Sequence, residues 1–396
     1  MTLDLLALYT DLHQHPELAF REHRTARVIA DRLAELGVPA TTGIGGTGVV
    51  GLLENGDGPV VWLRADIDGL PVREQTGLPY ASTATGEDAA GATWPTMHAC
   101  GHDMHITWLL GALERLLATR DEWAGTVVAV FQPAEEVIEG AAAMLDDGLA
   151  DRFPCPDVVL GQHSAPAPVG TIAVGSGPVM ASSDRLTVTF TGKGGHGSAP
   201  HTTFDPIVVA ASAVVRLQTI VSREVGPQEP AVVTVGSFHA GTRANIIPDT
   251  ATIEISTRAR SGETRAAVLE AIERIVTAEA AAGRLPAPTI RTDPGADVLV
   301  NDPAAADRVR TAIAAVVPGT VALESGLAMA SEDVGEYGAR LGVPTVYWFT
   351  GTTDPAVSAG GADVPTNHSP FYAPQAEPSI PVGVDAFVAA ARAHLG

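Results

Sequence analysis

The sequence predicts an α/β protein: a catalytic domain with a mixed sheet flanked by helices, interrupted by a smaller inserted α+β domain. Three short apolar runs, at 60–63, 126–131 and 157–162, have the pattern of buried strands, and a strongly apolar helical pattern follows residue 105. Each of the three runs is followed by acidic, amide or imidazole side chains. Because ligand sites of open α/β sheets gather at the carboxyl ends of strands, these ends are where we expect the functional site.

Charge and cysteine content narrow the possible partners. The 396 residues include 24 basic and 46 acidic side chains, and the formal net charge of −22 argues against nucleic acid and anionic membranes as partners. No apolar run is expected to span a bilayer, and the first residues lack the basic lead of a signal peptide. Two cysteines provide no disulfide framework, so we expect a cytoplasmic protein of two or three domains.

Residues 97–105 are unusually rich in side chains that can bind metal, with one thiol, three imidazoles and one carboxylate in nine residues. Helically spaced apolar residues follow from Ile106 to Leu117, so Cys100 and His102 are expected on the loop entering a helix, where Gly101 permits a tight turn. A thiolate and an imidazole on such a turn are typical transition-metal ligands, zinc first. The alternative is a buried thiol among surface histidines.

Glu135 and Glu136 follow the predicted strand at 126–131, and a helix is expected from 137 to 145. Neighbouring side chains diverge, so one glutamate can bind a metal while the other faces a substrate. The competing interpretation is an acidic helix start, which the helix dipole favours.

The other two strands also lead into candidate ligands. Asp66 and Asp68 follow the strand at 60–63, where each could be a ligand, a support for a ligand histidine, or part of a solvated turn. His163 stands at the predicted end of the third strand. Together these positions predict a metal site at one edge of the sheet.

Two patterns near the N-terminus carry less weight. Residues 3–36 are predicted to form two helices separated at Pro16, and His13 and His15 beside this break fit a surface corner better than metal ligands. Residues 43–48 match the glycine spacing of a dinucleotide-binding loop, but a strand-like run follows them instead of a helix. We therefore expect no dinucleotide site there.

From about Ser182 the pattern changes to strands with one exposed face, as Leu186, Val188 and Phe190 alternate with polar residues. The expected order is βαββαβ, with helices at 205–222 and 262–281, which predicts a compact α+β domain over 182–294. Residues 1–181 and 295–396 would form the metal-binding catalytic domain. In its second part we expect a helix at 302–316, a strand at 343–349 and a closing helix from about 380.

Several motifs together resemble the M20 family of metallopeptidases and amidohydrolases, and the resemblance covers essentially the whole chain. The most similar branch contains hippurate hydrolases, bacterial aminoacylases and plant auxin-conjugate hydrolases. The motifs are Leu12-His-x-x-Pro-Glu-Leu18, Arg64-Ala-Asp-x-Asp-x-Leu-Pro71, Cys100-Gly-His102-Asp, Gln132-Pro-Ala-Glu135-Glu136, Gly194-Gly-His196-Gly-Ser-Ala-Pro200 and Ala244-Asn245-Ile-Ile-Pro-Asp249, accompanied by His163 and His368.

The resemblance implies a two-metal centre. Its ligands would be Cys100, His102, Glu136, His163 and His368, with the Cys100 thiolate as the bridge and Glu135 as the general base. A bridging thiolate favours two zinc ions, with manganese or cobalt as alternatives. Asp66 stands where the wider family carries a ligand histidine, so its role is left open, and Asp68 would support the ligands from behind.

For the inserted domain the resemblance implies a lid that also forms a homodimer, or a higher oligomer. His196 would stabilise the oxyanion across the dimer interface, and Asn245 and Arg258 would hold the carboxylate end of the substrate. A plain surface role for Arg258 remains an alternative. Ser198 beside His196 could suggest a serine nucleophile, but one loop cannot supply the geometry of a catalytic triad.

The predicted function is metal-dependent hydrolysis of the amide bond of N-acyl amino acids, releasing a carboxylic acid and a free amino acid. Alternatives within the same family are a dipeptidase or carboxypeptidase-like enzyme and a deacetylase of N-acetyl-diaminopimelate. A catalytically silent metal-binding relative is less favoured, because such a protein would be expected to lose Glu135.

Overall fold

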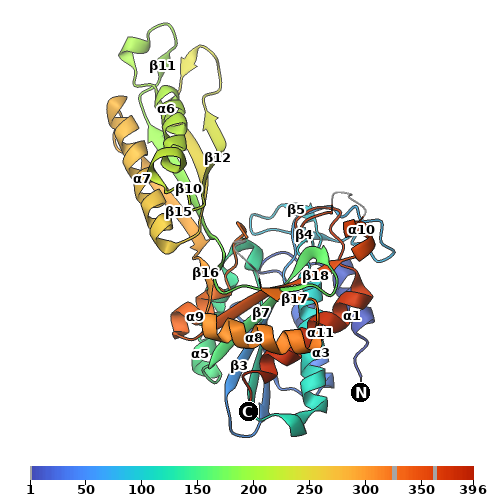
Figure 1. Ribbon diagram of the computed structural model, residues 1–396. Helices are drawn as coiled ribbons and strands as arrows, with labels where there is room; N and C mark the ends of the chain where they lie inside the picture. The colour runs from blue at the N-terminus through green and yellow to red at the C-terminus, as the bar shows by residue number, and fades with distance from the viewer. Residues whose placement is uncertain (1, 323–327, 360–363) are drawn as a thin grey trace. The chain divides into compact units, whose positions relative to one another are not determined.

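The computed structural model describes residues 2–322, 328–359 and 364–396 (Figure 1). The chain forms two compact units. Unit 1 comprises the described residues within Met1–Val179, Val300–Gly326 and Asp333–Gly396, and unit 2 those within Met180–Leu299 and Leu327–Glu332. The predicted inserted segment, 182–294, lies within unit 2. Its assignment as a lid and dimerisation domain stays a prediction.

Unit 1 is built on an eight-stranded mixed sheet, in the order β1-β2-β6-β3-β7-β18-β8-β17. The strands are β1 (Ala40–Ile44), β2 (Gly48–Asn55), β3 (Val60–Asp66), β6 (Gly125–Gln132), β7 (Val158–Pro168), β8 (Ile172–Val174), β17 (Thr320–Ala322) and β18 (Thr345–Thr353). The central strands β6, β3, β7 and β18 pair in parallel, while β1, β2 and β8 join them antiparallel. The predicted mixed sheet is confirmed, and residues 43–48 form the turn of the β1–β2 hairpin.

Helices cover both faces of this sheet (Figure 1). On one face the apolar side chains of β3, β6 and β7 join a single core with α1 (Leu5–Gln14), α2 (His23–Glu35), α3 (His102–Ala118), α8 (Pro303–Val316) and α11 (Ala376–Arg392). On the other face Trp62 packs edge-on against Tyr337 of α9 (Gly335–Leu341), with ring centroids 6.0 Å apart. Burial on both faces explains why the central strands are continuous apolar runs.

Several element boundaries in unit 1 differ from the prediction, three of them near the site or at the closing helix. β7 does not end at His163 but continues to Pro168, because β18 pairs with it along this length. The expected helix at 137–145 is a 3₁₀ turn, Glu135–Val137, followed by α4 (Gly140–Asp146), since Ile138 adopts a left-handed backbone that interrupts a helix. α11 begins at Ala376 and accommodates Pro381, so it starts earlier than the apolar pattern indicated.

Unit 2 has a four-stranded antiparallel sheet in the order β12-β14-β10-β15. The strands are β10 (Ser182–Thr191), β12 (Ala231–Ala240), β14 (Thr250–Ala259) and β15 (Thr289–Ala296), and α6 (Pro206–Thr219) and α7 (Gly262–Ala282) pack on them. The separate α+β domain with its own antiparallel sheet is confirmed. Two short strands, β11 (Gly195–His196) and β13 (Ile246–Ile247), pair with each other.

One helical stretch corrects the expectation about membrane-spanning segments. Pro206–Glu224 is long and apolar enough to cross a bilayer by length and composition. Its buried residues, including Val209, Ala213 and Leu217, belong to the apolar core of unit 2. The core helix of a soluble domain passes the same test of length and hydropathy, so this segment is weak evidence for a membrane span.

Candidate metal centre

The loop before α3 presents Cys100 and His102. Gly101 has a left-handed backbone, with φ of 82°, and a Cβ atom there would lie 2.3 Å from Ser164 Oγ. Glycine is therefore required both by the turn and by the close approach of β7. The turn places Cys100 just outside the helix and His102 as its first residue, and both side chains are buried.

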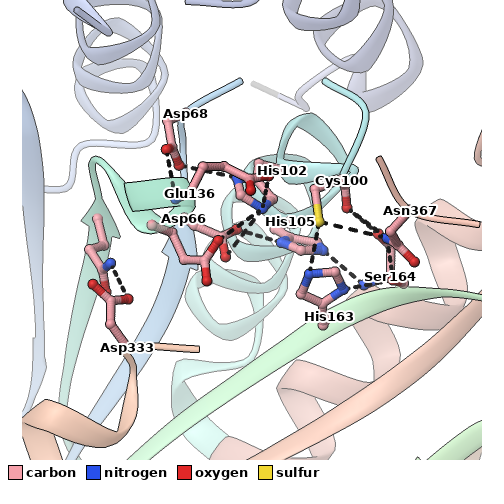
Figure 2. Close-up of polar contacts among 12 residues, drawn as sticks. Asp66, Asp68, Cys100, His102, His105, Glu136, His163, Ser164, Asp333 and Asn367 are labelled. Carbon is pink, nitrogen blue, oxygen red and sulfur yellow. Dashed lines mark hydrogen bonds and ion pairs between the residues drawn. The ribbon is translucent and has the colours of Figure 1, made fainter. Parts of the chain in front are cut away.

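The structure brings all five predicted metal ligands together, as Figure 2 shows for four of them. Donor atoms of Cys100, His102 and His163 lie within 4.8 Å of one another, and so do those of Cys100, Glu136 and His368. The Cys100 Sγ–His163 Nε2 distance is 3.4 Å, and the His368 Nε2–Glu136 Oε2 distance is 3.3 Å. This clustering supports the predicted ligand set, whose role in binding metal stays a prediction.

Hydrogen bonds assign the tautomers of two of these histidines. His163 Nδ1 donates to the Ser164 carbonyl oxygen at 2.7 Å, so its Nε2 lone pair faces Cys100. His102 Nδ1 donates to Asp68 Oδ1 at 3.2 Å, which leaves Nε2 as the inward-facing atom. Orientation of a histidine through its second nitrogen is the usual arrangement behind a metal ligand. Asp68 thus occupies the supporting position predicted for it.

Two buried atoms at the centre make no hydrogen bond, and this tests whether a metal would fit. His102 Nε2 and Glu136 Oε1 are buried without a hydrogen bond, and they lie 3.8 Å apart. Leaving polar atoms buried and unpaired is costly, and a cation bound between them would satisfy both. Thiolate, imidazole and carboxylate donors form a set that suits zinc and related transition metals.

Asp66 and His105 form a support that the sequence did not assign. Asp66 is fully buried, so the solvated-turn interpretation is wrong for it. His105 Nε2 accepts a hydrogen bond from the Ser164 N–H at 2.8 Å, so its proton is on Nδ1, which donates to Asp66 Oδ1 at 2.5 Å. Both nitrogens of His105 are therefore engaged in hydrogen bonds, which places it to orient Asp66 and Ser164. Arg64 Nη1 donates to Asp66 Oδ2 at 2.7 Å.

Asp333 (Figure 2) is hydrogen-bonded to Arg64 and to residues on either side of Glu135 and Glu136. Its Oδ1 accepts from Gln132 Nε2 at 2.7 Å and from Arg64 Nη2 at 3.1 Å, while its Oδ2 accepts from the Ala141 N–H at 2.9 Å. These contacts hold the turn between β6 and α4 at both ends. Asp333 follows no apolar strand, so the sequence offered no pattern that would identify it.

His13 corrects the prediction of a surface corner. It is fully buried, with Nδ1 2.7 Å from Asp103 Oδ2 and Nε2 3.1 Å from Glu74 Oε1. Burial disfavours its charged form, but the two carboxylates outweigh burial and raise the pKa of His13 to about 9. The histidine therefore ties α1 to the first turn of α3. His15 is exposed, as expected.

Three predicted site residues, His196, Asn245 and Arg258, lie in unit 2. His196 is exposed, and its Nδ1 accepts from Ser198 Oγ at 2.7 Å and from the Ser198 N–H at 3.1 Å. The Asn245 carbonyl oxygen accepts from the Gly197 N–H at 2.8 Å, so these two loops are neighbours. Arg258, on β14, is half-buried and donates to the Thr257 carbonyl oxygen at 2.9 Å. Their catalytic and substrate-binding roles stay predictions.

Comparison with known proteins identifies the family. The model of Peptidase family M20/M25/M40 matches residues 62–393. The chain belongs to this family. It is 40% identical over 310 residues to an N-acetyl-L-cysteine deacetylase of Bacillus subtilis, an alignment covering 78% of this chain and 71% of the relative. It is 45% identical over 266 residues to a hippurate hydrolase of Campylobacter jejuni, covering 67% of this chain and 66% of the relative.

A solved structure agrees with this assignment. The crystal structure of a dinuclear metal-binding peptidase of the M20 family from Bacillus subtilis superimposes with a TM-score of 0.79 at 32% identity, covering 98% of this chain and 96% of that one. The resemblance drawn from the motifs is therefore confirmed, and this family member is an amidohydrolase.

The raised pKa values of two predicted ligands lead us to expect that metal binding releases protons. Burial raises the pKa of Glu136 to about 8, and the pKa of His102 rises to about 10 because attraction to Asp66 and the hydrogen bond to Asp68 outweigh burial. Near pH 7 the metal-free centre therefore holds protons that a metal must displace, so affinity should increase as pH rises from 6 to 8. Calorimetric titration with zinc in buffers of different ionisation enthalpy should show release of at least one proton. Asp68→Asn, which weakens the attraction for the His102 proton, should reduce the number released; proton-free binding by the native enzyme would contradict this account.

Proposed function

We propose that this enzyme hydrolyses the amide bond of N-acyl amino acids, in the manner of an aminoacylase or hippurate hydrolase. The observation that carries the proposal is the placement of Glu135 beside the ligand cluster. Glu135 is 5% exposed, and its Oε2 lies 3.8 Å from His102 Nε2. The next residue, Glu136, points its carboxylate at His368 and His102. One turn thus supplies both a metal ligand and a second carboxylate for proton transfer.

The residues present divide the chemistry between them. Cys100, His102, Glu136, His163 and His368 would hold two metal ions, which would lower the pKa of water and polarise the scissile carbonyl group. Glu135 accepts the proton of the attacking water and delivers it to the departing amine nitrogen. General acid–base catalysis of this kind contributes typically ~10²- to 10⁴-fold. The Cys100 thiolate favours zinc, with manganese or cobalt as the alternatives.

The substrate class follows from the relatives. Two similar proteins carry the names of an N-acetyl-L-cysteine deacetylase and a hippurate hydrolase, whose substrates are both N-acyl amino acids. Arg258 and Asn245 would bind the carboxylate of the amino-acid part, since a guanidinium suits a carboxylate. The name of the similar solved structure, a peptidase, keeps a dipeptidase or carboxypeptidase-like activity as the second candidate. Relative kcat/KM for hippurate, N-acetyl amino acids and dipeptides separates these functions.

Substitution of the two adjacent glutamates tests the division of roles. Glu135→Gln should retain metal but lose at least ~10²-fold in kcat, because the proton acceptor is removed. Glu136→Gln, its matched control, should mainly lose metal. Metal content and kcat measured on the same preparations distinguish the two. Exchange of these phenotypes between the variants would show that the assignment along the dipeptide is wrong.

A homodimer in which each inserted domain offers His196 to the partner's metal centre is also proposed. His196→Ala should lower kcat by ~10²- to 10³-fold, the contribution of one oxyanion donor, with metal content intact. Mixing His196→Ala subunits with Glu135→Gln subunits gives the sharper test. Heterodimers would carry one doubly impaired site and one intact site, so activity should partly return. Subunit exchange demonstrated without any recovery would refute a shared site.

A further inference from the structure

Two residues with a left-handed backbone bracket the segment that carries Glu135. Among the described residues, those other than glycine with positive φ are Phe20 (59°), Ala134 (52°), Ile138 (60°), Arg284 (63°) and His368 (68°). Ala134 and Ile138 bracket the 3₁₀ turn Glu135–Val137. Side chains other than glycine rarely adopt this conformation, and such strain persists only where surrounding contacts hold it. The contacts that hold Ala134 are therefore informative.

One oxygen atom of Glu22 holds two of these strained residues. Glu22 Oε1 accepts from the Ala134 N–H at 2.9 Å and from the Phe20 N–H at 3.0 Å. Its other oxygen accepts from Thr47 Oγ1 at 2.5 Å. The side chain is fully buried although it precedes α2, whose first residue is His23. A buried carboxyl group that makes three contacts of this kind forms a rigid support.

The turn itself has little room to adjust. A Cβ atom on Gly140 would lie 1.6 Å from the Pro133 carbonyl oxygen, so the chain folds back tightly on itself. On the other side of Glu135 along the chain, the Glu136 N–H donates to Asp68 Oδ2 at 3.0 Å. Glu135 therefore lies between two backbone N–H groups that are each held by a buried carboxylate. If the φ angle of Ala134 relaxed, the direction of the Glu135 side chain would change.

We propose that Glu22 is a positioning residue for Glu135, acting by holding the left-handed backbone of Ala134 through the bond from its N–H. The proposal rests on the proposed role of Glu135 as general base. Among the described residues, the Glu22 carboxyl group hydrogen-bonds to Ala134, Phe20 and Thr47 and to none of the five predicted metal ligands. Its loss should therefore affect the direction of the Glu135 side chain more than metal or substrate binding. The effect should appear in kcat, because small misplacement of a catalytic group slows the chemical step.

The test replaces the acceptor and then relieves the strain. Glu22→Met, of similar length but without an acceptor, should lower kcat about 10- to 100-fold with metal content and KM essentially unchanged. Glu22→Gln retains an acceptor oxygen and should rescue most of the activity. The double variant Glu22→Met with Ala134→Gly should have a kcat at least about threefold higher than that of Glu22→Met alone. Glycine adopts positive φ without a steric penalty, so the turn no longer needs the bond to Glu22. Ile138→Gly relieves a neighbouring left-handed residue that Glu22 does not hold, and should restore nothing.

Glu17→Met is the matched control for loss of a carboxylate from the same region. The Glu17 carboxylate accepts from the Arg24 and Thr25 N–H groups at the start of α2, whereas the Ala134 N–H donates to Glu22. Its loss should lower the unfolding midpoint without lowering kcat.

Three results would overturn the proposal: full activity of Glu22→Met, a loss confined to metal content or KM, or no recovery with Ala134→Gly. If Glu22→Met fails to fold, recovery of folding by Ala134→Gly supports the proposal and continued failure refutes it. The proposed function is judged separately, by Glu135→Gln. Even if that variant stayed active, the unfolding midpoints of the Glu22 and Ala134 single and double variants would still measure their coupling.

Discussion

The site in unit 1 depends on how buried negative charge is balanced. Asp66, Asp68 and Asp333 are buried within this unit, and so is Glu22, whose pKa burial raises to about 7. Ionised groups cannot remain in such surroundings unless they are paired or hydrogen-bonded. Arg64 neutralises two of these carboxylates directly, and the others accept hydrogen bonds from backbone N–H groups or from a histidine. His102 Nε2 and Glu136 Oε1 face each other at 3.8 Å without a hydrogen bond, and a cation would fit between them.

The parallel strands bring these groups to one edge of the sheet. Asp66 is the residue on β3 that pairs with Gln132 of β6, so their side chains leave the sheet at the same level. His163 of β7 pairs in register with Phe349 of β18, still within the sheet, while Ser164 after it bonds to the loop that carries Cys100. The Asn367 side chain donates to the Cys100 and Ser164 carbonyl oxygens, both at 3.2 Å, which joins the segment before His368 to the same edge. The predicted ligands, from four separate parts of the chain, are thus held by hydrogen bonds that involve backbone groups.

Much of this centre could be predicted from local patterns. Apolar runs followed by polar residues located β3 and β6, and the glycine between Cys100 and His102 indicated the turn before α3. What could not be predicted involves partners far apart in the chain. His13 resembles a surface residue until Glu74 and Asp103 fold against it, and His105 is assigned only by the Ser164 N–H. Glu22 and Asp333 lie outside any apolar pattern, and their role is visible only through the backbone groups that they hold.

The most direct test of this account is a crystal structure of the zinc-loaded enzyme, with anomalous scattering recorded on both sides of the zinc absorption edge. The account predicts two anomalous peaks, with Cys100 Sγ touching both and His102, Glu136, His163 and His368 completing the ligands. Glu135 should lie beside the metals with an oxygen free to accept a proton. A single peak, a pair of peaks that excludes Cys100, or a metal held by His105 or His13 would contradict it.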